Sequence, residues 1–305
     1  MDKKKSRNFK VIDMLLLCLA ALPIIIVMVL KILTEPASEG ISLTGARIFF
    51  TVKMPLQDMY ITEAQINSWA VILAIFFLCL YFTHGLSQKA NTKRQIALEW
   101  IIEKTEGLVN GNMGTAFAGF ATFIAAIIGL SAFSSLLSLL GLFPPTSDIN
   151  ITSGWALMVF ILITYYKLKC GPLGYVKSFA EPVAFLAPLN VISEVATPVS
   201  MAFRHYGNIL SGVVISVLLG AGLKGLSSTV LGWLPGALGE IPFLQVGIPA
   251  ILSIYFDVFS GCLQAYIFAM LTMMYVSSAF NIDEFERRKL KKQQKRLNNY
   301  INSED

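Results

Sequence analysis

The stretch that decides the fold is FLAPLNVISEVATPVSMAFRHYGNILSGVVISVLLGAG, residues 185–222, in which Arg204 has about 19 mostly apolar residues before it and about 18 after it. A membrane span needs roughly 20 apolar residues, so the guanidinium is predicted near the middle of a membrane helix. An arginine there costs about 2.5–3.5 kcal/mol on insertion scales, and it keeps its charge because a guanidinium does not lose its proton in proteins. Such a charge is typical of an ion pathway or a buried partner. The alternative is a displaced span, with Arg204 reaching a membrane interface.

The composition of the chain is that of a membrane protein. Of its 305 residues, 55% are hydrophobic and 14% are charged, whereas a soluble domain carries about 25% charged residues. The apolar segments are continuous rather than alternating, which favours helices over the strands of a membrane barrel. We therefore predict an all-α polytopic membrane protein, with residues 1–305 forming a single membrane domain in the lipid bilayer.

Six apolar segments are predicted as membrane helices. They cover about 11–33, 66–86, 114–143, 151–168, 183–222 and 243–280. A signal peptide is the alternative for the first, but the run exceeds the usual length of about 7–15 apolar residues and no small-x-small cleavage site follows. We interpret 1–33 as a retained N-terminal helix, 34–280 as the core and 281–305 as a basic tail.

Two polar stretches between the spans have their own predicted positions. ARIFFTVKMPLQDMYITEA, residues 46–64, is amphipathic and is expected at the outer membrane interface. The stretch that follows the second span contains Lys89, Lys93, Arg94 and several glutamates, and it is expected to form a surface helix.

Basic residues predict the orientation. The net charge of +5 comes from clusters in MDKKKSRNFK at the start and FERRKLKKQQKR near the end. These clusters and the loops at 87–104 and 167–177 lie on one side if the chain has six spans. The positive-inside rule then puts both termini in the cytoplasm. The opposite side keeps only Lys31, Arg47, Lys53 and Lys224.

The sequence lacks the parts that several other functions need. A nucleic-acid role needs an aqueous domain to carry the basic patch, and none is present. The four cysteines and two histidines show no metal-ligand spacing, and no P-loop, HExxH or GxSxG pattern occurs. We expect no nucleic-acid partner, no metal, no cofactor and no catalytic site for nucleotide hydrolysis in this chain.

The fifth and sixth segments are too long for upright spans. About 38 residues form a helix of roughly 57 Å, whereas the hydrocarbon core is about 30 Å thick. Pro188, Pro198 and Pro249 allow bends. Two overlong segments in succession predict a hairpin of long, steeply tilted helices.

Polar residues form stripes on both segments at about 100° per residue. On the fifth, one sector of roughly 120° holds Asn190, Glu194, Met201, Arg204, His205, Asn208, Ser211 and Gly212. On the sixth, Ser253, Asp257, Ser260, Gly261, Gln264 and Phe268 share a face. Such stripes face protein or a water-filled cavity in a membrane. Interhelical hydrogen bonding alone is the alternative, above all for Asn190, Asn208 and Ser211. Carboxyl groups such as Glu194 and Asp257 are costly for that purpose and are candidates for titratable steps.

Five stretches occur together in the order of one family. They are QIALEWIIEKTEGLVNG (95–111), LLGLFPPTSDINITSGWALMVF (139–160), YVKSFAEPVAFLAPLNVISE (175–194), PVSMAFRHYGNILSG (198–212) and LQAYIFAMLTMMYVSSAF (263–280). With these motifs the chain resembles subunit a of F-type ATP synthases, the membrane stator that faces the rotating c-ring, over about residues 60–280. The resemblance implies a bacterial plasma membrane location. It also implies c-ring subunits, peripheral stalk subunit b and the remaining ATP synthase subunits as partners.

The family's mechanism implies roles for particular residues. A ring carboxylate takes an ion, most simply a proton, from one aqueous half-channel and gives it up to the other after rotation. Arg204 matches the essential arginine that separates the half-channels. The half-channel positions that the resemblance and the stripes suggest are Glu194, Asn208, Asp257, Gln264, Asp148, Asn150, His205 and Asn190.

The chain also departs from the family pattern. His205 and Tyr206 replace the usual Leu-Phe after the arginine, and Val213 stands where many members carry His or Glu. Residues 1–33 are an addition to the common five-span form. Two other classes remain as alternatives: a secondary transporter or channel with an intramembrane arginine, and a structural membrane scaffold. The choice between proton and sodium is not encoded in this chain.

Overall fold

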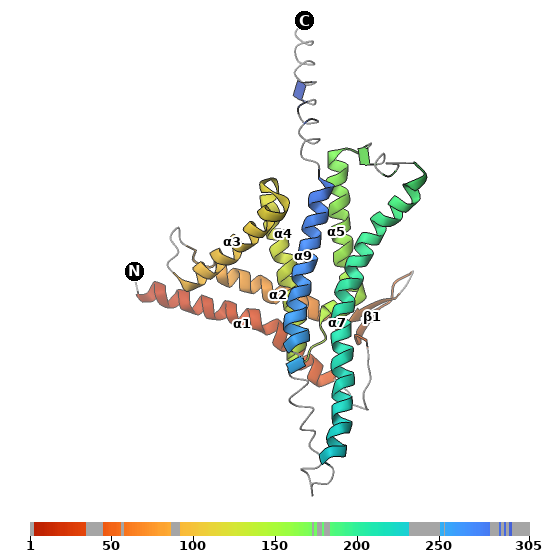
Figure 1. The fold of residues 1–305 in the computed structure, drawn as a ribbon. Helices are drawn as coiled ribbons and strands as arrows, with labels where there is room; N and C mark the ends of the chain where they lie inside the picture. Colours follow the sequence, from red (N-terminus) through yellow and green to blue (C-terminus); the bar gives the residue numbers. More distant parts are fainter. Residues whose placement is uncertain are drawn as a thin grey trace.

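Helices make up most of the structure, which is a computed structural model (Figure 1). It describes residues 3–34, 45–55, 58–86, 92–172, 174–175, 179, 184–231, 251–252 and 254–280, with 287, 290 and 293–294 in the tail. The α-helices are α1 (Lys3–Thr34), α2 (Glu63–Thr83), α3 (Lys93–Met113), α4 (Ala121–Leu136), α5 (Ile149–Cys170), α7 (Ala187–Leu231) and α9 (Gly261–Ala279). Short 3-10 turns are η1 (Thr115–Phe120), η2 (Leu137–Leu140), η3 (Pro145–Ser147) and η4 (Ala184–Leu186), and η6 (Ile254–Ser260) is a π-helix.

Six helical segments in the described chain are long and apolar enough to cross a membrane. They are Val11–Thr34, Glu63–Thr83, Thr115–Leu140, Ile149–Cys170, Ala187–Ser227 and Ile254–Ala279. This confirms the predicted polytopic helical fold. The polar helix α3 forms where a surface helix was expected, and Thr92 caps its N-terminus by accepting a hydrogen bond from the Gln95 backbone.

The amphipathic stretch before α2 folds differently from the simple interfacial segment that we expected. Strands β1 (Ile48–Val52) and β2 (Met59–Thr62) pair as an antiparallel hairpin, with Phe50 opposite Ile61 and Val52 opposite Met59. Both strands are rich in β-branched and aromatic residues, which favour extended backbone. We call the end of the bundle beside this hairpin the hairpin end. The opposite end, where α5 and α9 finish and α7 begins, is the tail end.

The long helix α7 exceeds its predicted length. It runs for 45 residues to Leu231, nine positions past the predicted end at 222, and therefore measures about 67 Å. Figure 1 shows α7 bent, with its first part leaning away from α5 and α9. Pro198 lies inside the helix, where it removes a backbone hydrogen bond and favours a bend. The tilt of α7 against a membrane stays a prediction.

The sixth span is of ordinary length in the described chain. Its described part, η6 plus α9, covers Ile254–Ala279 and runs antiparallel to α7, with which it is in contact (Figure 1). Most of the predicted start of the segment, 243–250 and Ser253, lies outside the described residues. The predicted helical hairpin is therefore seen as two contacting antiparallel helices.

Two apolar cores hold the helices together. The larger joins α3, α4, α5, α7 and α9 through buried residues such as Ile124, Val159, Phe268 and Met273. The smaller joins α1, α2 and η2 through residues such as Val27, Val71 and Leu137. Helix α1 thus packs against α2 at the side of the bundle remote from α5 (Figure 1). Its remaining surface is apolar and exposed, as expected for a helix in contact with lipid.

Candidate functional site

Arg204 lies on the outward face of α7. Its side chain is exposed, while Met201 and His205 on the same helix are buried. Among the described residues, Arg204 makes no hydrogen bond or ion pair. A permanent charge in a membrane span needs water or a counter-charge. The described residues offer no counter-charge at this face, so the guanidinium faces outward from α7.

His205 corrects the predicted polar stripe. The sector from Asn190 to Gly212 was expected to face one environment, but the boundary between interior and exterior passes through it. His205 is fully buried, while Arg204 and Ser211 are exposed. Helical periodicity predicts which residues share a sector, but only the packing of α7 against α5 and α9 selects the part of that sector that is covered.

The surroundings of His205 are those of a packed core residue. Its Nε2 lies 3.2 Å from the Ser131 hydroxyl of α4. The ring makes edge contacts with Trp155 of α5 and Phe268 of α9, at centroid distances of 5.8 and 5.5 Å. His205 therefore joins four helices one residue away from the outward-facing arginine.

A charged cluster lies at the tail end. Lys167, in the last turn of α5, donates to both carboxylate oxygens of Glu194 at 2.6 and 2.7 Å. The Tyr175 hydroxyl donates to Glu194 Oε1 at 3.4 Å. Burial raises the pKa of Tyr175, and the neighbouring Glu194 carboxylate raises it further, so the phenol keeps its proton and its donor role at neutral pH. Nearby, the Asn190 amide donates to the Phe179 carbonyl at 2.8 Å.

Asn208 connects α7 to the π-helix that carries Asp257. Its side-chain oxygen accepts a hydrogen bond from the Ser260 hydroxyl at 3.0 Å, and its amide nitrogen lies 3.4 Å from the Ser260 carbonyl. π-helical turns occur frequently at functional sites. The π-helix also changes the helical phase on which the predicted stripe of the sixth segment rested. Gln264 is buried inside the bundle, whereas Asp257 is half-buried and lines a cavity.

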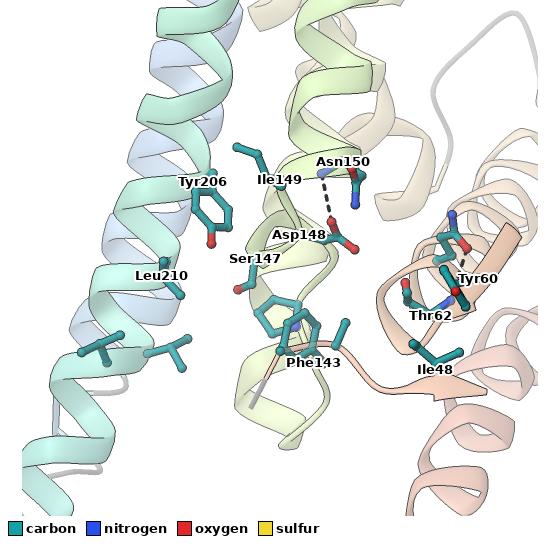
Figure 2. A pocket seen from close by; sticks show the side chains of 16 residues that line it. Ile48, Tyr60, Thr62, Phe143, Ser147, Asp148, Ile149, Asn150, Tyr206 and Leu210 are labelled. Carbon is teal, nitrogen blue, oxygen red and sulfur yellow. Dashed lines mark hydrogen bonds between the residues drawn. The ribbon is translucent and has the colours of Figure 1, made fainter. Parts of the chain in front are cut away.

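Two adjacent cavities open at the hairpin end. The first, of 640 Å³, lies between the β-hairpin, the 143–150 loop and the Tyr206–Val214 part of α7 (Figure 2). Asp148 and Asn150 both line it, and the Asp148 carboxylate caps α5 by accepting a hydrogen bond from the Asn150 backbone at 2.9 Å. Tyr206 reaches toward this loop from α7 (Figure 2).

The second cavity, of 400 Å³, shares part of its wall with the first. Gly45, Phe143, Pro144 and Val213 line both. The second holds Asp257 together with Lys31, Arg47 and Glu63. Sequence reasoning named Asp257 but assigned no site role to the other three. A signal was present for Lys31 and Arg47, because they are among the few basic residues on a side that is otherwise poor in them.

The structure therefore groups the candidate residues into three places. Asp148, Asn150 and Asp257 line adjoining cavities at the hairpin end, Glu194 and Asn190 lie at the tail end, and Arg204 lies between them along α7. In the described part of the chain, no group of three or more His, Cys, Asp or Glu residues is arranged to hold a metal ion.

The fold and these features define a class: a multi-pass helical membrane protein with an outward-facing charge in its longest span and cavities that contain carboxylate side chains at one end. Comparison with known families specifies it further. The family model described as ATP synthase A chain matches residues 66–277, and this chain belongs to that family. The match does not include α1 or the β-hairpin.

Curated relatives agree with this assignment. ATP synthase subunit a of Priestia megaterium is 34% identical over 242 residues, which cover 75% of this chain and 97% of the relative. The protein of the same name from Macrococcus caseolyticus is 32% identical over 222 residues, covering 68% and 86%. That from Enterococcus hirae is 34% identical over 229 residues, covering 70% and 89%.

Proposed function

We propose that this chain is the ion-translocating stator subunit of a rotary F-type ATP synthase in a bacterial plasma membrane, with Arg204 as its essential arginine. The observation that carries the proposal is the exposed guanidinium of Arg204 on the outer face of α7, without a partner among the described residues. A ring of subunits that brings carboxylates to this face would supply the missing counter-charge. The other expected partners are peripheral stalk subunit b and the remaining subunits of the complex.

Two access paths then lead to the arginine from opposite ends. We infer that the tail end is the cytoplasmic side, because Lys167 and Lys169 lie in the last turn of α5 there and basic residues favour the cytoplasmic ends of membrane helices. The outer path is formed by the cavities with Asp148, Asn150 and Asp257. Gln264 of α9 continues this path about two helical turns after Asp257. The inner path contains Glu194 and Asn190. Asn208 holds α7 against η6 between the two.

Arg204 works as a barrier because it cannot lose its charge. A cation that moves along one path meets a fixed positive charge before it can reach the other. The same charge favours the ionised form of a carboxylate opposite it. A transporter or channel that used an intramembrane arginine within its own bundle would enclose that side chain with an intrachain counter-ion, and the exposure of Arg204 disfavours that alternative.

The test is the replacement of Arg204 in the assembled complex. We expect Arg204→Ala to abolish ATP-driven ion pumping in inverted vesicles while the complex still assembles. Arg204→Lys should also fail largely, because a lysine loses the planar fork and releases its proton more readily when it is desolvated. Pumping is followed by quenching of a pH-sensitive dye, and assembly by the recovery of all subunits.

Arg287→Ala is the matched control, because it removes an exposed arginine that lies beyond the last span. It should pump normally. Near-normal pumping by Arg204→Lys at normal assembly would contradict the proposed role.

A further inference from the structure

We propose that the last turn of α1 is part of the outer access path, where Lys31 and Arg47 set the affinity of the Asp257 cavity for the translocated cation. The inference rests on the proposed function, because it assumes that Asp257 serves ion entry. It goes further by giving the additional N-terminal helix a role in ion translocation other than anchoring.

The two cations are held at the cavity wall by the backbone. The Lys31 ammonium donates to the carbonyl of Gly141, the residue that follows η2 with a left-handed φ of 71°. The Arg47 guanidinium lies 3.5 Å from the carbonyl of Thr34 at the C-terminus of α1, the helix end that favours a positive charge. The Arg47 carbonyl in turn accepts a hydrogen bond from the Glu63 backbone at 2.7 Å. The end of α1, the segment before β1 and the start of α2 are thereby joined around the cavity.

The four charged residues that line this cavity come from four different parts of the chain. Lys31 comes from α1, Arg47 from the segment before β1, Glu63 from α2 and Asp257 from η6. The uncharged polar side chains that line it are Ser138 of η2 and Ser216 of α7. The two cations therefore balance the two carboxylates.

This balance has a direct consequence for ion binding. A fixed positive charge repels a cation, so Lys31 and Arg47 lower the affinity of the cavity at Asp257 for a proton or another monovalent cation. Without α1 the cavity would carry an excess of negative charge and retain the cation more strongly. Lys31 and Arg47 act on the ion through the carboxylates, so they are positioning residues rather than groups that carry it.

Both cations lie outside the residues matched by the family model, which begins at residue 66. Lys31 comes from the last turn of α1, and Arg47 comes from the segment between α1 and β1.

The decisive variant is Lys31→Gln in the complete complex, because glutamine keeps an N–H donor for the Gly141 carbonyl but removes the charge. Purified complex in liposomes, with the outer face toward the lumen, is tested for ATP synthesis at a series of luminal proton concentrations and a constant potassium diffusion potential. A parallel series varies luminal sodium. We expect the luminal ion concentration at half-maximal rate to fall about threefold to tenfold, with the maximal rate and the assembly unchanged.

Matched variants separate charge from structure. Lys31→Arg keeps the charge and should leave the half-maximal concentration at the wild-type value. Lys53→Met removes another basic residue near the hairpin that lines neither cavity, and it should also leave that concentration unchanged. If Lys31→Gln fails to assemble, Arg47→Gln tests the same cavity and should shift the concentration in the same direction.

The Asp257→Asn background separates this inference from the proposed function. Asp257→Asn alone should slow ATP synthesis. Lys31→Gln added to Asp257→Asn should leave the luminal ion concentration at half-maximal rate nearly unchanged. A normal rate in Asp257→Asn overturns the outer path itself. A slowed rate in Asp257→Asn, combined with an unshifted half-maximal concentration in Lys31→Gln, leaves the path intact and overturns the role of α1.

Discussion

At the scale of single residues, Arg204 and His205 are consecutive and have opposite environments. Arg204 points out of the bundle, and His205 is enclosed by Ser131, Trp155 and Phe268. The polar stripe of the fifth segment suggested His205 as a half-channel residue, although it departs from the pattern of the family. Its complete burial favours a packing role, in which the imidazole replaces the leucine usual at that position and gains a hydrogen bond to a neighbouring helix.

We predict that His205→Leu lowers the stability of the complex but preserves its ion flux. Leucine fills the site with apolar atoms and leaves the Ser131 hydroxyl buried without its partner, which costs about 1–3 kcal/mol. The measurement is the thermal midpoint of the detergent-solubilised complex, together with pumping per assembled complex in vesicles.

Ser131→Ala provides the control for this prediction. When His205→Leu and Ser131→Ala are combined, neither partner of the hydrogen bond remains, so no polar group is left unpaired there. The combined variant should therefore regain much of the stability that His205→Leu alone loses. Flux that drops in His205→Leu at an unchanged thermal midpoint would instead assign His205 to a half-channel.

At the scale of helices, close packing brings the sixth span against its neighbours. A Cβ added at Gly212 of α7 would lie 3.1 Å from Cβ of Phe256 in η6, and one added at Gly261 would lie 2.5 Å from Cβ of Ser135 in α4. The Asn208–Ser260 hydrogen bonds lie between these two contacts. The π-helix that carries Asp257 is thus held between α4 and α7 by two glycines and one polar pair.

Gly261→Ala should push α4 and α9 apart. The new methyl group would overlap Ser135, and overpacking of this kind costs about 1–3 kcal/mol. We expect reduced assembly, a lower thermal midpoint and slower ion flux, because the displaced turn carries Asp257.

Gly129→Ala is the matched control, since it adds a methyl group on α4 where no atom lies within 4 Å. It should assemble like the wild type or slightly better, because alanine favours the helix. Equal behaviour of the two alanine variants would show that the contact at Gly261 is not limiting.

At the scale of the whole molecule, α1 is attached to the core at both ends. At one end Asp13 lies 2.9 Å from the Arg94 guanidinium of α3 and 3.0 Å from His84 Nδ1 at the end of α2. At the other end Lys31 contacts the Gly141 carbonyl. Burial on its own would disfavour the ionised form of Asp13, and the contacts with Arg94 and His84 offset this free-energy cost. The basic ends of the chain predict the orientation of the bundle in the membrane.

The topology makes a prediction for the intact cell. A single cysteine at Lys4, in a chain whose four native cysteines are replaced by alanine, should resist membrane-impermeant thiol reagents, because the positive-inside rule predicts a cytoplasmic N-terminus. A second chain with its single cysteine at Lys53, beside the β-hairpin, should be labelled from outside. Rapid labelling at position 4, or loss of residues 1–33 from the mature protein, would contradict the predicted topology.

Much of the fold was predictable because membrane helices are local objects. Each span satisfies its own backbone hydrogen bonds and can be recognised in the sequence from a run of about 20 apolar residues. The β-hairpin was missed, since its strands are short and amphipathic and become evident only when Phe50 and Ile61 pair across it. The continuation of α7 to Leu231 was missed because hydropathy declines before the helix ends.

The sequence alone determined the membrane class, the six spans, the basic ends and the presence of a permanent charge in the fifth span, because these depend on composition and on neighbouring residues. Tertiary structure decided which polar residues meet. It buried His205 while leaving Arg204 exposed. It also placed Asp257, on a π-helix, at the wall of a cavity that Lys31 lines as well, although the two residues are more than 200 positions apart. The physical reason is that periodicity defines the faces of a helix, whereas only packing against other helices determines what each face meets.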